Sequence, residues 1–434
     1  MVFSKEESLV YGFKLSSVGP GKVSGTDVVH ELSSMDLAMK LHYLRGVYFF
    51  DSQAVQGLTI HHIKETMFTW FNEYYHTCGR FRRSDGGRPY IKCNDCGARF
   101  IEAQCDRTID EWLGMKDWSS LQNLLVSQQV IGPELSFSPP VLLQITYFKC
   151  GGLAFGLSWA HVLGDAFSAI DFINRWGQIM ALYQPNAPPP NTKLENFENS
   201  PGIAKELPLS LKRVDPVGDH WITPNNSKME LFSFTITPSQ ITHFQMKVMG
   251  PIFESLCAIM WKSIAKIRQD GSEPKTVSIC KNDHKKHKSG KLSNSLLIST
   301  VKTDISVPDA DPNKLAKFLV DQAIDETTQI KEAVEKDQGV SDFVVYGANL
   351  TFVDFQEADL YGLEFQGHKP IFASYTIQGV GDKGVVLVLP GPPKDSGKNG
   401  GDGKLVTVIL PEGEILELKS ELRKNDLLLE NTIE

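Results

Sequence analysis

The sequence has no long apolar run. None approaches the roughly 20 residues that a membrane-spanning helix requires, and residues 1–7 show no basic start followed by an apolar stretch. We therefore expect neither a membrane-spanning helix nor a secretory signal. Apolar residues (41%) and charged residues (22%) occur in amounts that are ordinary for a globular protein.

A surplus of basic residues is also missing. The chain has 44 Lys and Arg against 52 Asp and Glu, which gives a formal net charge of −8. A nucleic-acid-binding surface needs positive charge to neutralise phosphates. The charge therefore argues against a nucleic-acid partner.

Cysteine is sparse, with seven residues in the whole chain. An odd number without a secretory signal is typical of reduced thiols in a cytosolic setting. Cys93 and Cys96 form a C-x-x-C pair, but a structural zinc would need a second ligand pair, and none follows at a suitable spacing. We interpret residues 93–97 as a turn between strands and expect no metal site.

The residue patterns predict an α/β protein of two domains, because 434 residues exceed one ordinary core. Runs rich in β-branched and aromatic residues predict strands at 10–17, 47–50, 140–148, 153–159, 230–237, 341–353 and 384–389. Apolar stripes at helical spacing predict helices at 59–75, 165–183, 253–267 and 415–429. Residues 184–202 contain five prolines and predict a linker. We expect domains at 1–184 and 211–434, joined by a crossover linker at 185–210.

An H-x-x-x-D motif, His161 to Asp165, follows the apolar run at 153–159. The ordinary pKa of histidine, near ~6.5, lets it accept a proton at neutral pH. Gly164 permits a tight bend between strand and helix, and Asp165 could orient the ring or fix the backbone. In the alternative interpretation, Asp165 is only the N-cap of the next helix and His161 is a polar residue at a strand end. The spacing alone favours this alternative, because H-x-x-x-D often occurs by chance.

Several segments resemble the BAHD superfamily of plant acyl-CoA-dependent acyltransferases. They are residues 74–80, 87–94, 144–165, 253–262 and 410–412, so the resemblance covers essentially the whole chain. It implies an α/β fold of two chloramphenicol-acetyltransferase-like domains, with mixed sheets flanked by helices and a central channel between them. It also implies that His161 deprotonates an acceptor, whose oxygen or nitrogen attacks the thioester of acyl-CoA, and that Asp165 is structural.

A second signature of this family, D-F-G-W-G before Lys-Pro, is degraded here. It aligns with Glu364, Phe365, Gln366, Gly367 and His368, ahead of Lys-Pro at 369–370. Gln366 and His368 replace two glycines, so any positive φ that those glycines supplied would be strained. A Tyr-Phe-Gly-Asn segment, usual in catalytic members near the domain junction, does not occur after residues 279–288. Together these losses make acyl transfer by this chain doubtful.

Other segments resemble one branch of the family, the Eceriferum-two and Glossy-two clade of plant cuticular-wax proteins. They are residues 35–43, 157–161, 346–352, 379–384 and 88–97, the last most similar to Eceriferum-twenty-six. The resemblance implies an accessory factor of very-long-chain fatty acid elongation that modulates the product length of a ketoacyl-CoA synthase. The alternative is an active acyl-CoA-dependent O- or N-acyltransferase with His161 as the general base.

The same resemblance sets expectations for ligands and location. Acyl-CoA would be a ligand or substrate, no bound cofactor is expected, and the residues that would contact CoA stay unassigned. The partner would be the ketoacyl-CoA synthase, the condensing enzyme of the fatty acid elongase. We expect a monomer at the cytosolic face of the endoplasmic reticulum or in the cytoplasm, with the nucleus as an alternative. Membrane association would be peripheral and through the partner.

Overall fold

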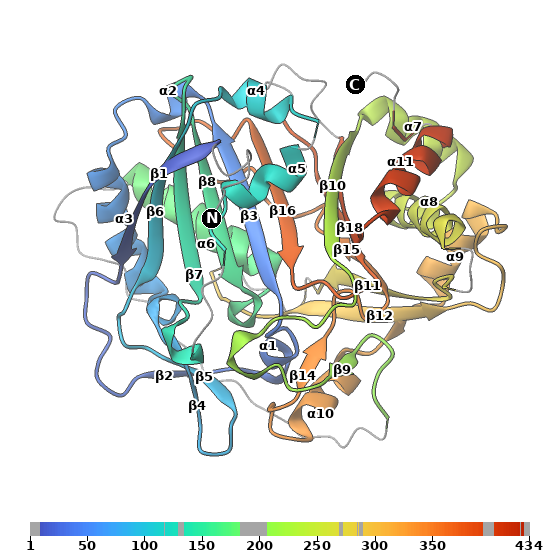
Figure 1. Ribbon diagram of the computed structural model, residues 1–434, viewed down its shortest axis with the longest axis horizontal. Coiled ribbons are helices and arrows are strands. Elements are labelled where there is room, and N and C mark those ends of the chain that lie inside the picture. Colours follow the sequence, from blue (N-terminus) through green and yellow to red (C-terminus); the bar gives the residue numbers. More distant parts are fainter. Residues whose placement is uncertain are drawn as a thin grey trace.

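The computed structural model describes residues 9–116, 118–128, 134–182, 206–268, 272–283, 285, 290–393, 403–425 and 427–428. These residues form a mixed α/β protein with two large sheets (Figure 1). The predicted linker at 185–210 falls largely outside the described residues.

The first large sheet has six strands in the order β1-β6-β7-β8-β3-β16. Their bounds are Val10–Val18 (β1), Tyr43–Phe50 (β3), Ala98–Cys105 (β6), Val141–Phe148 (β7), Leu153–Ala160 (β8) and Phe372–Gln378 (β16). The pair β6 and β7 is parallel and the other pairs are antiparallel. The strands β3 and β8 are buried at every position, which explains why their sequences are mostly apolar and do not alternate, with Arg45 and Ser158 as the polar exceptions.

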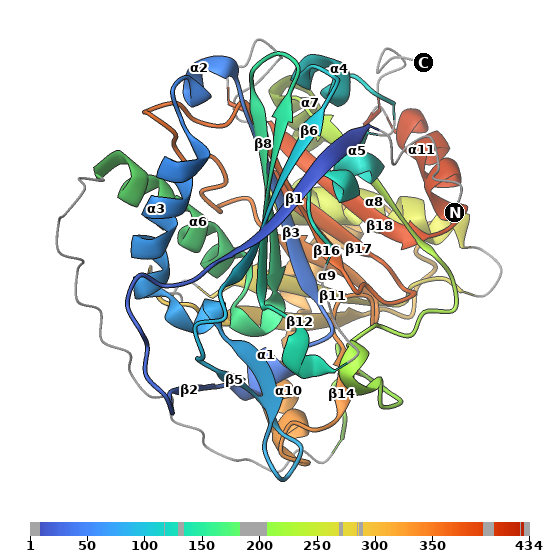
Figure 2. The same cartoon turned by 60° about the vertical axis from the view of Figure 1, so that its left-hand side comes forward.

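The helices α3 (Ile60–Glu73) and α6 (Ala166–Leu182) lie side by side against this sheet (Figures 1 and 2). Their apolar stripes meet where Trp70 stacks on Trp176, with ring centroids 5.4 Å apart. Both indole N–H groups are satisfied inside the core: Trp70 donates to the carbonyl of Phe172 at 2.9 Å and Trp176 to the hydroxyl of Thr66 at 3.1 Å. The predictions of helices at 59–75 and 165–183 are confirmed.

The second large sheet has seven strands in the order β10-β18-β17-β15-β11-β12-β13. Their bounds are Met229–Ile236 (β10), Thr276–Asn282 (β11), Leu296–Lys302 (β12), Ile324–Asp325 (β13), Leu350–Asp354 (β15), Val385–Pro390 (β17) and Lys404–Pro411 (β18). The helices that gather on one side of it (Figure 1) are α7 (Pro238–Lys247), α8 (Ile252–Ile267), α9 (Pro312–Asp321) and α11 (Glu414–Lys424). The prediction of helices at 253–267 and 415–429 is confirmed, the latter over a shorter range.

Smaller elements surround the two large sheets. Two small sheets are formed by β2 (Val29–Glu31), β5 (Pro89–Lys92) and β4 (Arg80–Arg83), and by β14 (Asp342–Val344) and β9 (Lys212–Val214). Short α-helices are α1 (Ser34–Ala38), α2 (Ser52–Val55), α4 (Ile109–Leu113), α5 (Trp118–Leu121) and α10 (Thr327–Glu335). Single 3-10 turns are η1 (Tyr75–Cys78), η2 (Gln122–Leu124), η3 (Leu135–Phe137), η4 (His161–Leu163) and η5 (Gly218–His220).

The two large sheets do not correspond to two consecutive halves of the chain. Strand β16 comes from the second half of the chain, yet it pairs with β3 of the first sheet, from Phe372 opposite Phe49 to Gln378 opposite Tyr43. The larger hydrophobic core likewise combines residues from both halves, whereas the smaller core contains only residues from 234 onward. The domain bounds 1–184 and 211–434 therefore stay a prediction, and they leave out this exchange of a strand.

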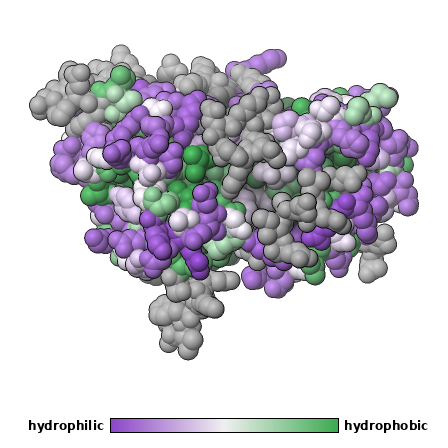
Figure 3. Space-filling view, turned by 90° about the horizontal axis from the view of Figure 1, so that it is seen from above, coloured by the Kyte–Doolittle hydropathy of each residue, from purple (hydrophilic) through white to green (hydrophobic). Residues whose placement is uncertain are grey.

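Seen from above, the described surface is mostly hydrophilic and spreads over two lobes (Figure 3). Among the described residues, no single helix has both the length and the apolar composition of a membrane span. The helices α7 and α8 meet those criteria only when taken together, and they are bent by 76° where they join.

Candidate functional site

His161 opens the single turn η4 directly after the central strand β8. Its backbone N–H donates to the carbonyl of His42 at 3.1 Å, and its own carbonyl accepts from the side-chain amide of Asn294 at 2.8 Å. The chain then turns at Gly164, which has a φ of +150°. A Cβ at Gly164 would meet the Cβ of Ser168 at 2.8 Å and the backbone nitrogen of Ser293 at 3.0 Å. The glycine is therefore required both by the backbone conformation and by the lack of space.

The ring of His161 is closed off from solvent. The residue has no exposed surface, and its Nε2 atom forms a 3.0 Å hydrogen bond with the hydroxyl of Tyr346. Burial lowers the pKa of His161 to about 4, although the carboxylate of Asp165 opposes the shift. Burial also raises the pKa of Tyr346 well above its usual value. Both groups are therefore neutral at pH 7.

His42 fixes the position of Tyr346. Its Nε2 atom accepts hydrogen bonds from the backbone N–H groups of Val345 at 3.1 Å and Tyr346 at 3.3 Å. The ring of His42 also contacts the ring of Tyr346 edge-on, with centroids 4.9 Å apart. Because Nε2 accepts, His42 is neutral, in agreement with burial, which lowers its pKa to about 3. Two buried histidines from the first half thus hold one tyrosine from the second.

The prediction of a single strand at 341–353 is wrong, and Tyr346 lies where it breaks. The segment forms two separate strands, β14 and β15, with a turn between them. Gly347 in this turn has a φ of +86°, and a Cβ there would meet the backbone oxygen of Gly381 at 2.4 Å. The run of β-branched and aromatic residues therefore hides a turn that only glycine can make. The sequence assigned no role to Tyr346 or His42, although both belong to segments that resemble the wax-protein clade.

Asp165 joins the two halves of the chain through hydrogen bonds to Ser168 and Ser295. One carboxylate oxygen accepts from the backbone N–H of Ser168 at 3.0 Å and so caps α6. The other accepts from the backbone N–H and the hydroxyl of Ser295, at 2.9 and 3.0 Å. Asp165 is fully buried, so these bonds replace all of its hydration. The N-cap interpretation is confirmed, and the contact with Ser295 adds a link to the loop before β12 that the spacing could not predict.

The degraded second signature forms an ordered hairpin turn. Phe365 and His368 exchange two backbone hydrogen bonds, of 3.0 and 2.9 Å. The two residues between them, Gln366 and Gly367, have φ values of +53° and +81°, the pattern that a type I′ turn requires. The expected strain therefore falls on Gln366, which adopts a positive φ without being glycine. Gly367 replaces a tryptophan of the signature and fits the turn.

This hairpin is anchored on the first sheet by its phenylalanine. Phe365 has no exposed surface and stacks on Phe50 of β3, with ring centroids 4.2 Å apart. It also meets Trp176 of α6 edge-on at 5.4 Å. Glu364, by contrast, makes only an exposed contact of 3.8 Å with Lys369, which contributes little to stability. His161 and residues 364–368 therefore have separate sets of neighbours and do not form one site.

The C-x-x-C segment connects two strands, as predicted. It lies between β5 and β6, with Asp95 at a φ of +55° and Gly97 at +83°. The carboxylate of Asp95 accepts from the backbone N–H and the hydroxyl of Ser24, at 2.8 and 2.6 Å. Among the residues that the structure describes, no group of three or more His, Cys, Asp or Glu side chains is arranged to hold a metal ion.

As it stands, Nε2 of His161 is not free to accept a proton from a substrate. If Nε2 carries the ring proton, it has no lone pair to offer; if it does not, its lone pair accepts from the hydroxyl of Tyr346. In the first of these tautomers the lone pair lies on Nδ1, which is buried and has no hydrogen-bond partner among the described residues. At Nε2, an acceptor molecule would have to displace that hydroxyl, and at either nitrogen it would have to enter a site with no exposed surface. The geometry therefore supports a structural role for His161, in the same sense as that of Asp165.

Comparison with known proteins fits this geometry into a family. The profile of the Transferase family matches residues 18–424. The chain belongs to the BAHD transferase family. Protein ECERIFERUM 26-like from Arabidopsis thaliana is 43% identical over 96% of this chain and 96% of its own length. Protein ECERIFERUM 2 from the same plant is 40% identical over 96% of this chain and 99% of its own length.

Solved structures show the same fold at low sequence identity. Vinorine synthase superposes with a TM-score of 0.70, covering 98% of this chain and 99% of its own, at 15% identity. TRI101 from F. graminearum, solved with coenzyme A and deoxynivalenol, gives a TM-score of 0.67 over 92% and 99%, at 13% identity. The prediction of an α/β acyltransferase fold is confirmed.

Proposed function

We propose that this BAHD protein is an accessory factor of very-long-chain fatty acid elongation for cuticular wax. It would modulate the product length of a ketoacyl-CoA synthase without transferring an acyl group itself. The observation that carries the proposal is the hydrogen bond between Nε2 of His161 and the hydroxyl of Tyr346, within a fully buried site. Full-length similarity to ECERIFERUM proteins supports it.

The partner and location follow from the same proposal. The ketoacyl-CoA synthase would bring the protein to the cytosolic face of the endoplasmic reticulum, and the protein itself would be a monomer. Acyl-CoA would be a ligand of the complex or of the condensing enzyme.

The test is co-expression with a panel of ketoacyl-CoA synthases, with acyl chain length as the readout. His161→Gln keeps a neutral polar side chain but removes the imidazole, and Tyr346→Phe removes only the hydroxyl that blocks it. We expect both variants to support the longest acyl products as well as the original protein does, at equal protein levels. Loss of those products in His161→Gln, with normal protein levels, would contradict the proposal.

The second candidate is an active acyl-CoA-dependent O- or N-acyltransferase with His161 as the base. The intact H-x-x-x-D motif favours it, and so do more distant relatives named for transferase activity, such as hydroxycinnamoyltransferase 1 from Oryza sativa subsp. japonica, 23% identical over 84% of this chain. Purified protein would be incubated with long-chain acyl-CoA and a panel of alcohols and amines. Release of free CoA that disappears in His161→Gln would establish this function and overturn the first.

A further inference from the structure

A cavity of about 330 Å³ lies where β3 and β16 of the first sheet face β10 and β18 of the second. Its apolar walls include Leu41, Trp221, Leu231, Ile377 and Val380. Its polar lining consists of Arg45, Asn123, Gln128, Thr223, Asn225, Thr376 and Gln378. The residues around it do not include His161, so this cavity is separate from the H-x-x-x-D site. Its volume is at the lower end of the range for small-molecule sites, roughly 300–1,000 Å³.

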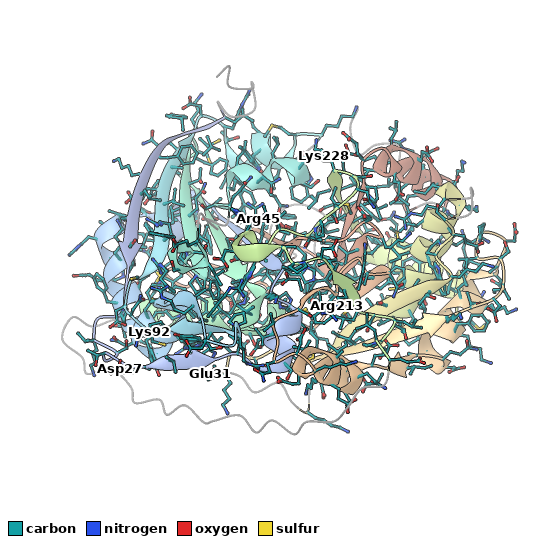
Figure 4. All side chains as sticks on the ribbon, turned by 60° about the horizontal axis from the view of Figure 1, so that its bottom comes forward. Asp27, Glu31, Arg45, Lys92, Arg213 and Lys228 are labelled. Carbon is teal, nitrogen blue, oxygen red and sulfur yellow. The ribbon has the colours of Figure 1, made fainter. Side chains whose placement is uncertain are left out.

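Among the residues that the structure describes, Arg45 is the one charged residue that lines the cavity. It extends from β3 near the middle of the molecule (Figure 4), and only 6% of its surface is exposed. Burial lowers its pKa to about 10, which still leaves it protonated at pH 7. Within the part of the chain that the structure describes, Arg45 forms no ion pair. A buried charge without a counter-charge is costly and rare.

The guanidinium has donors to spare. One terminal nitrogen donates to the side-chain oxygen of Asn123 and the other to the carbonyl of Val126. The buried Nε has no partner among the described residues. Within that part of the chain, two of the five N–H groups of the guanidinium are engaged and three have no protein partner. Two further lining residues, Asn225 and Gln378, have a buried side-chain oxygen without a partner among the described residues. These oxygens are acceptors, so a donor such as water would satisfy them, whereas a carboxylate would not. The cavity thus combines one uncompensated cation with unsatisfied polar atoms and apolar walls.

We propose that this cavity binds a monoanionic carboxylate with a medium-sized apolar body, through the guanidinium of Arg45. A carboxylate matches the paired N–H groups of arginine, and one negative charge matches the single cation of the lining. A phosphate, with its second charge, would lack a second cation. The apolar walls of the cavity would contact the apolar body of such a ligand. A small hydrated anion would leave those walls without a contact. The site does not depend on the accessory role proposed above.

Decanoate is a suitable probe, with decanol and decyl phosphate as matched ligands that differ only in the head group. Calorimetry on the full chain should detect decanoate, and binding should raise the melting temperature. We expect both matched ligands to bind at least about ten-fold more weakly. Decanol has no charge to pair with Arg45, and the second charge of decyl phosphate would be buried without a second cation. Equal affinity for decanol would overturn the role of the charge, and tighter binding of decyl phosphate would overturn the carboxylate assignment.

Two variants locate the site. Arg45→Met should weaken decanoate binding about ten-fold or more, and Leu231→Trp should do so by filling the cavity while leaving the contacts of Arg45 with Asn123 and Val126 in place. Arg213→Met is the matched control, because Arg213 is an exposed arginine on β9 that pairs with Asp337. This variant should bind decanoate as the original protein does. Unchanged binding in Leu231→Trp would overturn the proposal, even if Arg45→Met fails to fold.

Discussion

His161 and Arg45 are both close to strand β3, but the polar atoms of the first have partners within the chain and those of the second are partly unpaired. The backbone of His161 bonds to His42, just before β3, and Arg45 belongs to β3 itself. At the H-x-x-x-D motif, the ring Nε2 and both carboxylate oxygens already have partners within the chain. At Arg45, a permanent charge faces a cavity with donors unused. The H-x-x-x-D motif is thus closed by bonds within the chain, whereas the cavity at Arg45, where we propose a ligand, has donors unused.

The sharpest way to break this comparison is to remove the carboxylate of Asp165. Asp165→Ala should lower the free energy of unfolding by about 4 kcal/mol, because three buried hydrogen bonds to a charged group are lost. Urea denaturation measures it. Asp311 is the matched control, since it also caps a helix, α9, but at the surface; Asp311→Ala should cost only about 1 kcal/mol. Equal losses in the two variants would mean that Asp165 is no more than a cap.

Acid should open the closed site. Burial lowers the pKa of His161 to about 4 and of His42 to about 3, below the ordinary value of ~6.5. The unfolded chain therefore takes up these protons first, so their contribution to stability is complete above pH ~6.5 and is lost as the pH falls toward 4. We expect the free energy of unfolding to drop by on the order of 3 kcal/mol for His161 over that range. In His161→Gln the drop in the free energy of unfolding between pH ~6.5 and pH ~4 should be smaller than in the original protein. An equal drop in the two proteins would contradict the burial of His161.

The two candidate segments also differ in how tightly their turns are packed. Gly164 and Gly367 both have positive φ, but only Gly164 has atoms close to where a Cβ would stand. Gly164→Ala should therefore cost about 3 kcal/mol through strain and overlap, and Gly367→Ala about 1 kcal/mol through strain alone. Thermal or urea unfolding of the pair measures the difference. If Gly367→Ala proves the more costly, the 364–368 hairpin is the more constrained of the two sites.

The smallest expected effect comes from the hydroxyl that covers His161. Tyr346→Phe should cost about 1 kcal/mol, since one buried hydrogen bond is lost with little change in shape. Tyr375→Phe is its control, because the Tyr375 hydroxyl forms a similar buried bond, of 2.8 Å, with Tyr48. The stability losses should be alike, but only Tyr346→Phe should change the environment of His161.

Local patterns predicted the helices α3, α6, α8 and α11 and the strands β1, β3, β7, β8, β10 and β17, because burial of one face leaves a periodic record in the sequence. Other strands, among them β6, β11, β12 and β18, were not predicted. The exchange of β16 into the first sheet left no such record, since its pairing with β3 joins residues more than 300 positions apart. The same holds for the contact of Tyr346 with His161, because the two residues are 185 positions apart in the sequence. Gly347, within an otherwise strand-like run, was the one local signal for the break that places Tyr346. Arg45 gave no signal, because the sequence around an arginine in an apolar strand does not show whether its charge has a counter-charge in the fold.

The central claim is that His161 is buried and its Nε2 engaged, which is the observation behind the proposed accessory role. Hydrogen–deuterium exchange at the ring carbon between the two nitrogens, followed by mass spectrometry, reports both accessibility and pKa for each histidine. His61, whose side chain is 82% exposed, serves as the internal reference. We expect His161 to exchange at least about ten-fold more slowly than His61 at pH 7, and faster once Tyr346→Phe removes the cover. Exchange of His161 at the rate of His61 in the original protein would contradict the account.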